Sequence, residues 1–149
     1  MSAIRFYDPR LGAYCGLSNL HPVPVTVDGR DFATPEHAFQ FYRARDPKVG
    51  DWLAAAPTPE LSAVAGDALT PEETALGWSD IQLAVMERIL RAKFAQHAFR
   101  ALLLSTGDAY LVEWSPEDGE IARFWGEYEG QGDNHLGYLL MRLRAGMRG

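Results

Sequence analysis

Apolar residues recur at helical spacing through much of the second half of the chain. The longest such pattern covers residues 79–98 and continues through 98–105, ending before Gly107. A last helix is predicted after Asn134, because a set of apolar side chains falls on one of its faces. That set is Leu136, Leu139, Leu140, Leu143 and Met147.

Two shorter segments have the alternation or composition of strands. Val23, Val25 and Val27 alternate with polar or small residues and lead into Asp28-Gly29, so a hairpin with a tight turn is predicted there. The run Tyr110–Trp114 is rich in residues that favour strands and predicts another one.

Three copies of Thr-Pro-Glu begin at Thr34, Thr58 and Thr70. Each copy offers a hydroxyl for a helix N-cap, a proline for the first helical position and an acid that the helix dipole favours. The sequence therefore predicts three helix starts, and Thr70 with Glu73 also fits a capping box.

The remaining segments are predicted as connections. These are a loop at 8–22, a connection with a short helical turn around Trp52 at 46–58, and a long loop at 115–133 rich in Gly, Asp and Glu. Several helices with a few short strands that do not alternate with them indicate an α+β, mainly helical fold. The 149 residues are expected to form a single compact domain, 1–149.

Composition narrows the classes of function. The chain has 14 Lys+Arg against 20 Asp+Glu, and this net charge of −6 disfavours a general nucleic-acid binder. The single cysteine excludes an intrachain disulfide and a cysteine-based zinc cluster. Apolar runs fall short of the ~20 residues of a membrane span, and the first residues lack a signal-peptide core. We expect a cytoplasmic protein with no membrane partner.

Lys93 is one of two lysines and lies on an apolar helix face. On a helical wheel of residues 81–98 it falls beside Met86, Ile89 and Leu90. Two interpretations are open from the wheel. The side chain extends to the rim of the core, or it points into a polar pocket, where it could bind a phosphate or attack a carbonyl or an opened sugar.

Glu36 shares a helical stripe with Gln40 and Arg43. In one interpretation its carboxylate complements the helix N-terminus and pairs with Gln40 or Arg43. In the other, the carboxyl lies among aromatic residues, which would raise its pKa and suit a general acid or base. Trp125 lies in a Gly-rich segment and is a candidate for stacking on a ring.

Motifs of the commonest cofactor and metal sites are missing from the sequence. The four histidines are scattered without the spacing of a metal site, so we predict no metal ligands and no cofactor. Neither a phosphate-binding loop, a dinucleotide fingerprint nor a nucleophile elbow is present.

Taken in order, a set of short motifs resembles the YbiA-like, or NADAR, family from about Phe6 to Arg144. The motifs are Gly16-Leu17-Ser18-Asn19-Leu20, Thr34-Pro35-Glu36-His37 with Gln40, Trp78, Val85-Met86, Ala92-Lys93-Phe94, Leu103 to Asp108, Glu113, Trp125-Gly126, Asn134-His135-Leu136-Gly137, Leu140-Met141 and Arg144.

The resemblance implies a compact, mainly helical domain that cleaves a base–ribose N-glycosidic bond. One branch of the family acts on phosphorylated intermediates of riboflavin synthesis, and another removes ADP-ribose from guanine in nucleic acid. The implied partner is a small nucleotide-like substrate or ADP-ribosylated single-stranded DNA. The oligomeric state is left open. Two other functions stay open: a binding module for a nucleotide or ADP-ribose without turnover, and an antitoxin-type eraser of ADP-ribosyl-guanine.

The resemblance also assigns the site. Glu36 is expected to be the catalytic carboxylate, Lys93 to act at the sugar through a Schiff base with ribose C1, and Asp118 to be a further catalytic acid. The expected substrate-binding residues are Asn19, His37, Gln40, Arg43, Trp78, Trp125, Gly126, Gly132, Asn134 and Gly137.

This chain departs from the family at several charged positions. Six residues separate Asp118 from Trp125 where the family has two, and alignment on Trp125 would put Ala122 at the acid position. Ala63, Asp67 and Asp133 stand where the family often has cations, and Arg43 replaces a lysine. Phosphate binding is therefore expected to be weaker, or to move to Arg5, Arg10 or Arg123.

Overall fold

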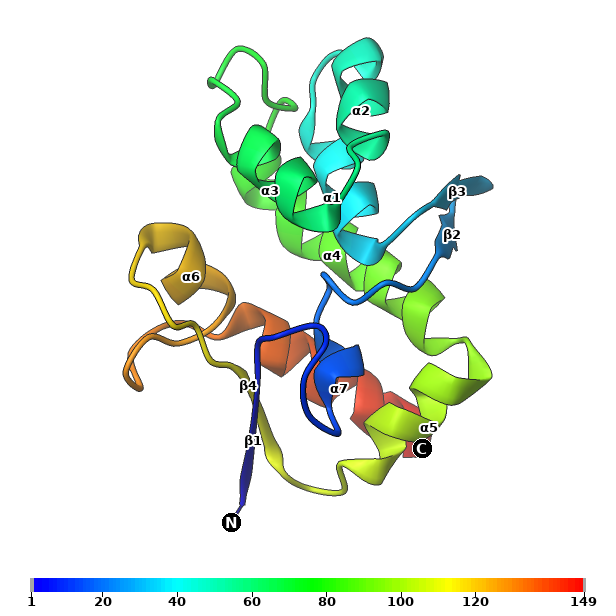
Figure 1. Cartoon of the computed structure of the whole chain (residues 1–149), viewed down its shortest axis with the longest axis vertical. Coiled ribbons are helices and arrows are strands. Elements are labelled where there is room, and N and C mark those ends of the chain that lie inside the picture. Colours follow the sequence, from blue (N-terminus) through cyan, green and yellow to red (C-terminus); the bar gives the residue numbers. More distant parts are fainter. Residues whose placement is uncertain (1, 149) are drawn as a thin grey trace. The chain divides into compact units, whose positions relative to one another are not determined.

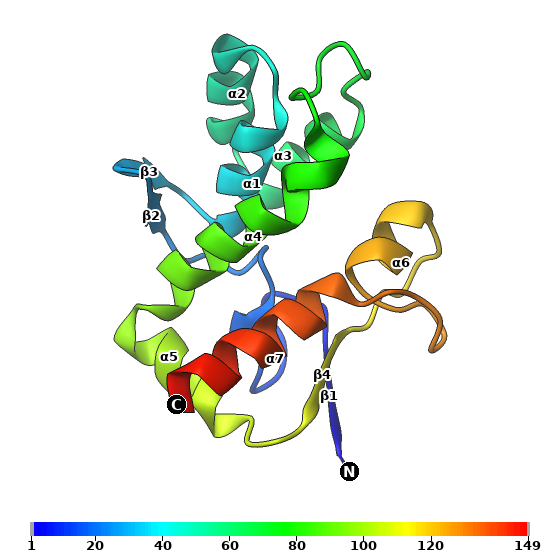
Figure 2. The same cartoon turned by 180° about the vertical axis from the view of Figure 1, so that it is seen from behind.

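The structure is a computed structural model and describes residues 2–148 (Figures 1 and 2). Helices make up about half of that part of the chain, and strands much less. In chain order its elements are β1 (Ala3–Phe6), the 3-10 turn η1 (Cys15–Leu17), β2 (Val25–Val27), β3 (Arg30–Phe32), α1 (Pro35–Arg43), α2 (Pro47–Ala54), α3 (Pro59–Asp67), α4 (Trp78–Phe94), α5 (His97–Ser105), β4 (Tyr110–Glu113), α6 (Glu120–Trp125) and α7 (His135–Arg148). The predicted class, α+β and mainly helical, is confirmed.

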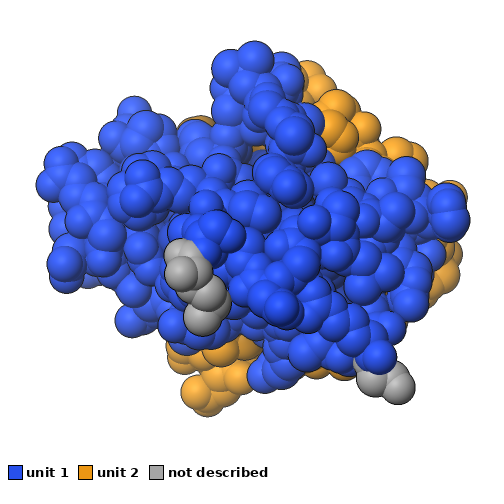
Figure 3. Space-filling view, turned by 90° about the horizontal axis from the view of Figure 1, so that it is seen from below, with its two compact units in different colours: residues 1–18, 94–149 blue, residues 19–93 orange. Residues whose placement is uncertain are grey.

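The chain divides into two compact units, coloured separately in Figure 3. Unit 1 comprises Met1–Ser18 with Phe94–Gly149, and unit 2 is Asn19–Lys93. The single domain over 1–149 stays a prediction.

Unit 2 forms around helices that start at Thr-Pro. Thr34 and Thr58 cap α1 and α3 through their hydroxyls, as predicted. The hairpin is also confirmed: β2 pairs antiparallel with β3, and Asp28 and Gly29 both have positive φ, as a tight turn of this type requires. Helix α1 packs against both α2 and α3.

Two predictions for unit 2 were wrong. The connection at 46–58 contains a full helix, α2, because Asp46-Pro47 supplies the same cap and proline as the Thr-Pro-Glu copies. At Thr70 the capping box forms with Glu73, yet only a turn follows. The chain there pairs instead with the segment after α1, since Arg45 N–H donates to the carbonyl of Glu73 and Ala75 N–H to that of Arg43.

Unit 1 is built on a parallel strand pair that the sequence pattern did not predict. Strand β1 pairs with β4 in the register Ala3↔Tyr110 to Phe6↔Glu113, and α7 packs on β4. The predicted loop at 115–133 was wrong in part, because it contains α6. The predicted continuation of helix through 98–105 is interrupted at Gln96, whose extended backbone starts α5 anew.

Candidate active site

Glu36 lies in the first turn of α1 and is held from two sides. Its backbone N–H donates to the carbonyl of Asn19 at 3.2 Å. Its carboxylate Oε2 accepts a 2.6 Å hydrogen bond from Nε2 of Gln40, one turn further along the same helix. The predicted pairing of Glu36 with Gln40 is thus present, whereas Arg43 donates to Asp67 at 2.7 Å instead.

Burial raises the pKa of Glu36 from 4.5 to about 7. The hydrogen bond from Gln40 and the charge of Arg43 lower this pKa, while the negative charges of Asp67 and Glu60 raise it. Part of the residue stays accessible to solvent. Near neutral pH the carboxyl is therefore present in both forms, which is the condition for a group that gives and takes a proton.

Three polar atoms around Glu36 lack a hydrogen-bond partner within residues 2–148. They are Asn19 Oδ1, Gln40 Oε1 and Arg43 Nε, and all three are buried. Buried polar atoms are paired in the large majority of cases, so an unpaired cluster needs an explanation. All three residues were predicted to bind substrate, and each contacts Glu36 or acts on its charge.

His37 is buried with both ring nitrogens in use. Nδ1 lies 2.8 Å from Oγ1 of Thr34, and Nε2 lies 3.0 Å from the carbonyl of Ala56. The ring therefore ties the start of α1 to the segment after α2, and this places it as a support for Glu36.

Helix α4 presents the predicted lysine and tryptophan. Trp78 begins the helix, is 9% exposed, and packs its ring 5.1 Å from that of Phe39 on α1. Lys93 in the last turn is fully buried, so the inward orientation is the one observed. Asn19 Nδ2 donates to the sulfur of Met86, which lies two helical turns before Lys93 on the same face. Asn19 therefore links this face of α4 to the backbone of Glu36.

The predicted site residues of unit 1 form a tight backbone junction between β4, α6 and α7. Asn134 is fully buried and has φ 50°. Its side chain accepts from Glu113 N–H and donates to the Leu111 carbonyl and the Tyr110 hydroxyl.

Three glycines make this junction possible. A Cβ atom would lie 2.1 Å from the Glu113 carbonyl oxygen at Gly126, 2.3 Å from the Gly126 oxygen at Gly132, and 2.1 Å from the Leu111 oxygen at Gly137. None of the three positions has space for a side chain, so each glycine allows two backbone segments to pack closely together. Trp125 ends α6 and packs edge-on against Phe124 with ring centroids 4.8 Å apart.

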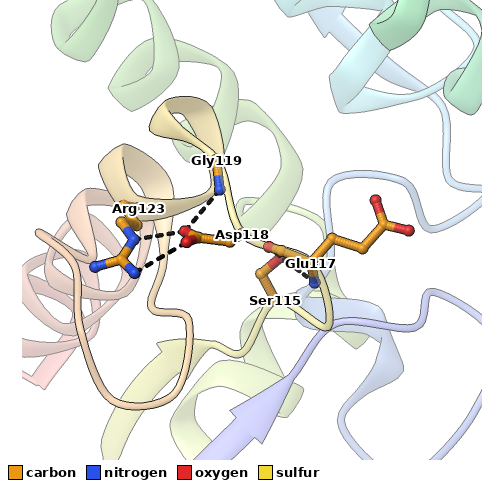
Figure 4. A network of polar contacts seen from close by, with 5 residues as sticks. All are labelled: Ser115, Glu117, Asp118, Gly119 and Arg123. Carbon is orange, nitrogen blue, oxygen red and sulfur yellow. Dashed lines mark hydrogen bonds and ion pairs between the residues drawn. The ribbon is translucent and has the colours of Figure 1, made fainter.

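Asp118 is exposed and engaged in a local ion pair (Figure 4). Its carboxylate accepts bonds of 2.6 and 3.1 Å from Arg123 and one of 2.8 Å from Gly119 N–H. The Arg123 guanidinium lowers the pKa of Asp118, so the group stays ionised. This geometry fixes the start of α6, and the catalytic role of Asp118 stays a prediction.

Sequence patterns missed two residues that shape the neighbourhood of Glu36. Gly66 faces Gln40 from α3, and the only local signal was the spacing of the small residues Ser62 and Gly66, four apart on one helix face. Asp67 was noted for its charge, but its pairing with Arg43 joins two helices and was not predicted.

Residues 2–148 contain neither a cluster of metal ligands nor a membrane-spanning helix. No three His, Cys, Asp or Glu side chains there converge on a point that could hold a metal ion. Every helix in that range is too short or too polar to cross a bilayer.

A partly accessible carboxyl whose pKa lies near neutrality, on a helix that also carries buried unpaired polar atoms, is typical of a site that transfers protons. The model of the NADAR domain matches residues 5–148. The chain belongs to the NADAR domain family.

Similar proteins include ones named as N-glycosidases and ones named for riboflavin biosynthesis. N-glycosidase YbiA of Escherichia coli is 40% identical over 134 residues, which cover 88% of this chain and 80% of that protein. Riboflavin biosynthesis protein VVA0006 of Vibrio vulnificus is 34% identical over 146 residues, 95% of this chain and 37% of that protein. The NMR structure of the E. coli protein YbiA superposes with a TM-score of 0.86 at 37% identity, covering 99% of this chain and 85% of that one. The predicted enzyme class, an N-glycosidase, is confirmed.

Proposed function

We propose that this enzyme hydrolyses the bond between a base and ribose in a small phosphorylated nucleotide, of the type formed early in riboflavin biosynthesis. The names of the relatives support both the bond and the substrate class. The observation that carries the proposal for this chain is Glu36, a partly accessible carboxyl with a pKa of about 7 next to unpaired polar atoms.

Cleavage of an N-glycosidic bond passes through a state that resembles an oxocarbenium ion at ribose C1. A carboxylate near C1 lowers the energy of that state. Glu36 can supply the negative charge when ionised and can deliver a proton to the departing base when protonated. We assign it both tasks in sequence: the protonated carboxyl gives its proton to the departing base, and the carboxylate that results stabilises the positive charge at C1.

Lys93 is assigned to the sugar. Its Nζ would bond to C1 as the C1–N bond to the base breaks, and the base leaves with a proton. The ring then opens to an iminium ion, which water hydrolyses to free ribose phosphate and the lysine amine. Full burial of the side chain supports this role, because lysines that form Schiff bases are buried, whereas lysines that only add surface charge are exposed.

The remaining predicted residues are assigned to substrate binding or its support. Either Trp78 or Trp125 offers a ring face on which the base can stack. Asn19 Oδ1 and Arg43 Nε are unpaired acceptor and donor atoms for polar groups of the substrate. In unit 2, His37 supports the start of α1, which carries Glu36. In unit 1, Gly126, Gly132, Asn134 and Gly137 shape the backbone that follows Trp125.

The state of the arginines supports a substrate with few phosphates. Arg43 is paired with Asp67 and Arg123 with Asp118, while the Arg5 guanidinium stacks 4.0 Å from the ring centroid of Trp114. The two ion pairs offset positive charge that a diphosphate would need.

The test is release of base, detected by chromatography with mass spectrometry. The panel contains phosphorylated ribosylaminopyrimidines, ADP-ribosylated guanine, and the same guanine in single-stranded DNA. We expect base from the pyrimidines. Release only from the ADP-ribosylated substrates would replace the proposed substrate with the other branch. Binding of a panel member without release of base from any would identify a binding module and overturn the proposal.

A further inference from the structure

Gly66 of α3 lies directly against the side chain that holds the Glu36 carboxylate. A Cβ atom at position 66 would lie 1.8 Å from Oε1 of Gln40 and 2.5 Å from its Cδ. Both distances are far below contact, so any residue except glycine would displace the Gln40 amide. Gly66 and Gln40 are both buried, so the amide has little space into which it could move.

The Gln40 amide is held by shape on one side and by a hydrogen bond on the other. Nε2 donates to Glu36 at 2.6 Å, whereas Oε1 has no hydrogen-bond partner within residues 2–148. Leaving a carbonyl oxygen buried and unpaired is unfavourable, and a methionine would fill similar space without that oxygen. What Gln40 provides that methionine cannot is the donor to Glu36.

We infer that Gly66 is a positioning residue: by leaving space for the Gln40 amide, it fixes the hydrogen bond that orients the Glu36 carboxyl for catalysis. The inference rests on the proposed function of Glu36 and adds two residues through which that function is set. Gln40 then acts on Glu36, and Gly66 acts on Gln40.

The coupling predicts how Glu36 titrates. The charged groups that act on Glu36 are Arg43 on its own helix and Asp67 and Glu60 on α3, and none of them changes in the variants below. Because the Gln40 donor favours the ionised carboxylate, its loss raises the pKa of Glu36. The sign is the same whether Glu36 serves as acid or as base, since either limb of the pH–rate profile would move to higher pH.

The experiment compares Gly66→Ala, Gln40→Met and the double variant with the wild type. Titration of Glu36 is followed by NMR of carboxyl-labelled glutamate, with Glu36→Gln identifying the resonance, and kcat/KM is measured against pH. We expect each single variant to raise the pKa by about one unit, as loss of one hydrogen bond to a carboxylate does. The double variant should show no further rise, because both changes remove the same bond.

Gly146→Ala is the matched control. This glycine is also helical, a Cβ atom there meets nothing within 4 Å, and the pKa of Glu36 should be unchanged. Thermal unfolding reports whether Gly66→Ala folds; Gln40→Met tests the same bond if it does not.

The outcomes separate this inference from the proposed function. An unchanged Glu36 pKa in Gln40→Met, or additive shifts in the double variant, would overturn the inference even if base is released normally. If the Glu36 pKa shifts as expected but no substrate releases base, the positioning of Glu36 by Gly66 and Gln40 is supported. Only the proposed function is then overturned.

Discussion

Nε2 of Gln40 donates a 2.6 Å hydrogen bond to Oε2 of Glu36, one helical turn away. The bond favours the ionised carboxylate, while burial favours the protonated form more strongly, and the balance gives a pKa of about 7. The proposed acid–base chemistry depends on this balance.

Glu36 should make stability depend on pH. Its folded-state pKa of about 7 lies above the ordinary 4.5, so between these values the folded chain retains a proton that the unfolded chain has released. Stability therefore falls as pH rises through that interval. Glu36→Gln removes the effect and should stabilise the fold at about pH 8, by up to roughly 3 kcal/mol, but not at about pH 4. Denaturant unfolding at both pH values checks this, and an equal effect at both would contradict the raised pKa.

Lys93 should be trapped on the sugar. Reduction with borohydride during turnover should leave a stable sugar adduct on the peptide that contains Lys93, because reduction of an iminium ion is irreversible. Peptide mass spectrometry measures the adduct. Lys48→Met is the matched control, since Lys48 is exposed and is the other lysine of the chain. An adduct that persists in Lys93→Met would remove the lysine from the mechanism.

Asp118 should affect the rate of base release only through its ion pair with Arg123. Because Arg123 holds this exposed carboxylate, Asp118→Asn and Arg123→Met should each reduce the rate of base release by less than about tenfold, the scale of a surface ion pair. Steady-state kinetics of the two variants measure this rate. If Asp118→Asn abolishes turnover while Arg123→Met does not, Asp118 is catalytic.

Single substitutions at the junction in unit 1 should lower the free energy of unfolding. Asn134→Ala loses the contacts to Tyr110, Leu111 and Glu113 and leaves buried groups unpaired, so we expect a loss of ~2–4 kcal/mol in the free energy of unfolding. Gly137→Ala should destabilise as well, because its Cβ would lie 2.1 Å from the Leu111 oxygen.

A glycine in open space gives the control for that comparison. Gly146→Ala in the same helix, α7, should instead stabilise the fold by up to about 1 kcal/mol. Chemical denaturation measures the free energy of unfolding of each variant. A Gly137→Ala protein as stable as the wild type would show that the β4–α7 approach is adjustable.

Local signals predicted the elements whose ends are set by neighbouring residues. The caps at Thr34 and Thr58 and the Asp28-Gly29 turn depend on a few adjacent side chains, and all three formed as expected. At Thr70 the same local signal was outweighed by pairing with the segment after α1. Strand β1 was missed because its partner, β4, lies more than a hundred residues away.

Sequence patterns predicted contacts within one helix of the candidate site but not contacts between helices. The helical wheel placed Lys93 among apolar neighbours, and burial agrees. The stripe of Glu36 and Gln40 gave their hydrogen bond. The pairing of Arg43 with Asp67, and the space that Gly66 leaves for Gln40, depend on how α3 packs against α1, and no local pattern specifies that packing.

The most direct test of the account is base release by the wild type, Glu36→Gln and Glu72→Gln on one ribosylaminopyrimidine phosphate. Glu72 is the matched control, because it occupies the same place in the third Thr-Pro-Glu copy and is exposed. We expect normal release by the wild type and Glu72→Gln, and a rate about 10²–10⁴-fold lower for a folded Glu36→Gln. Release by Glu36→Gln at the wild-type rate would contradict the central claim that this carboxyl carries the cleavage.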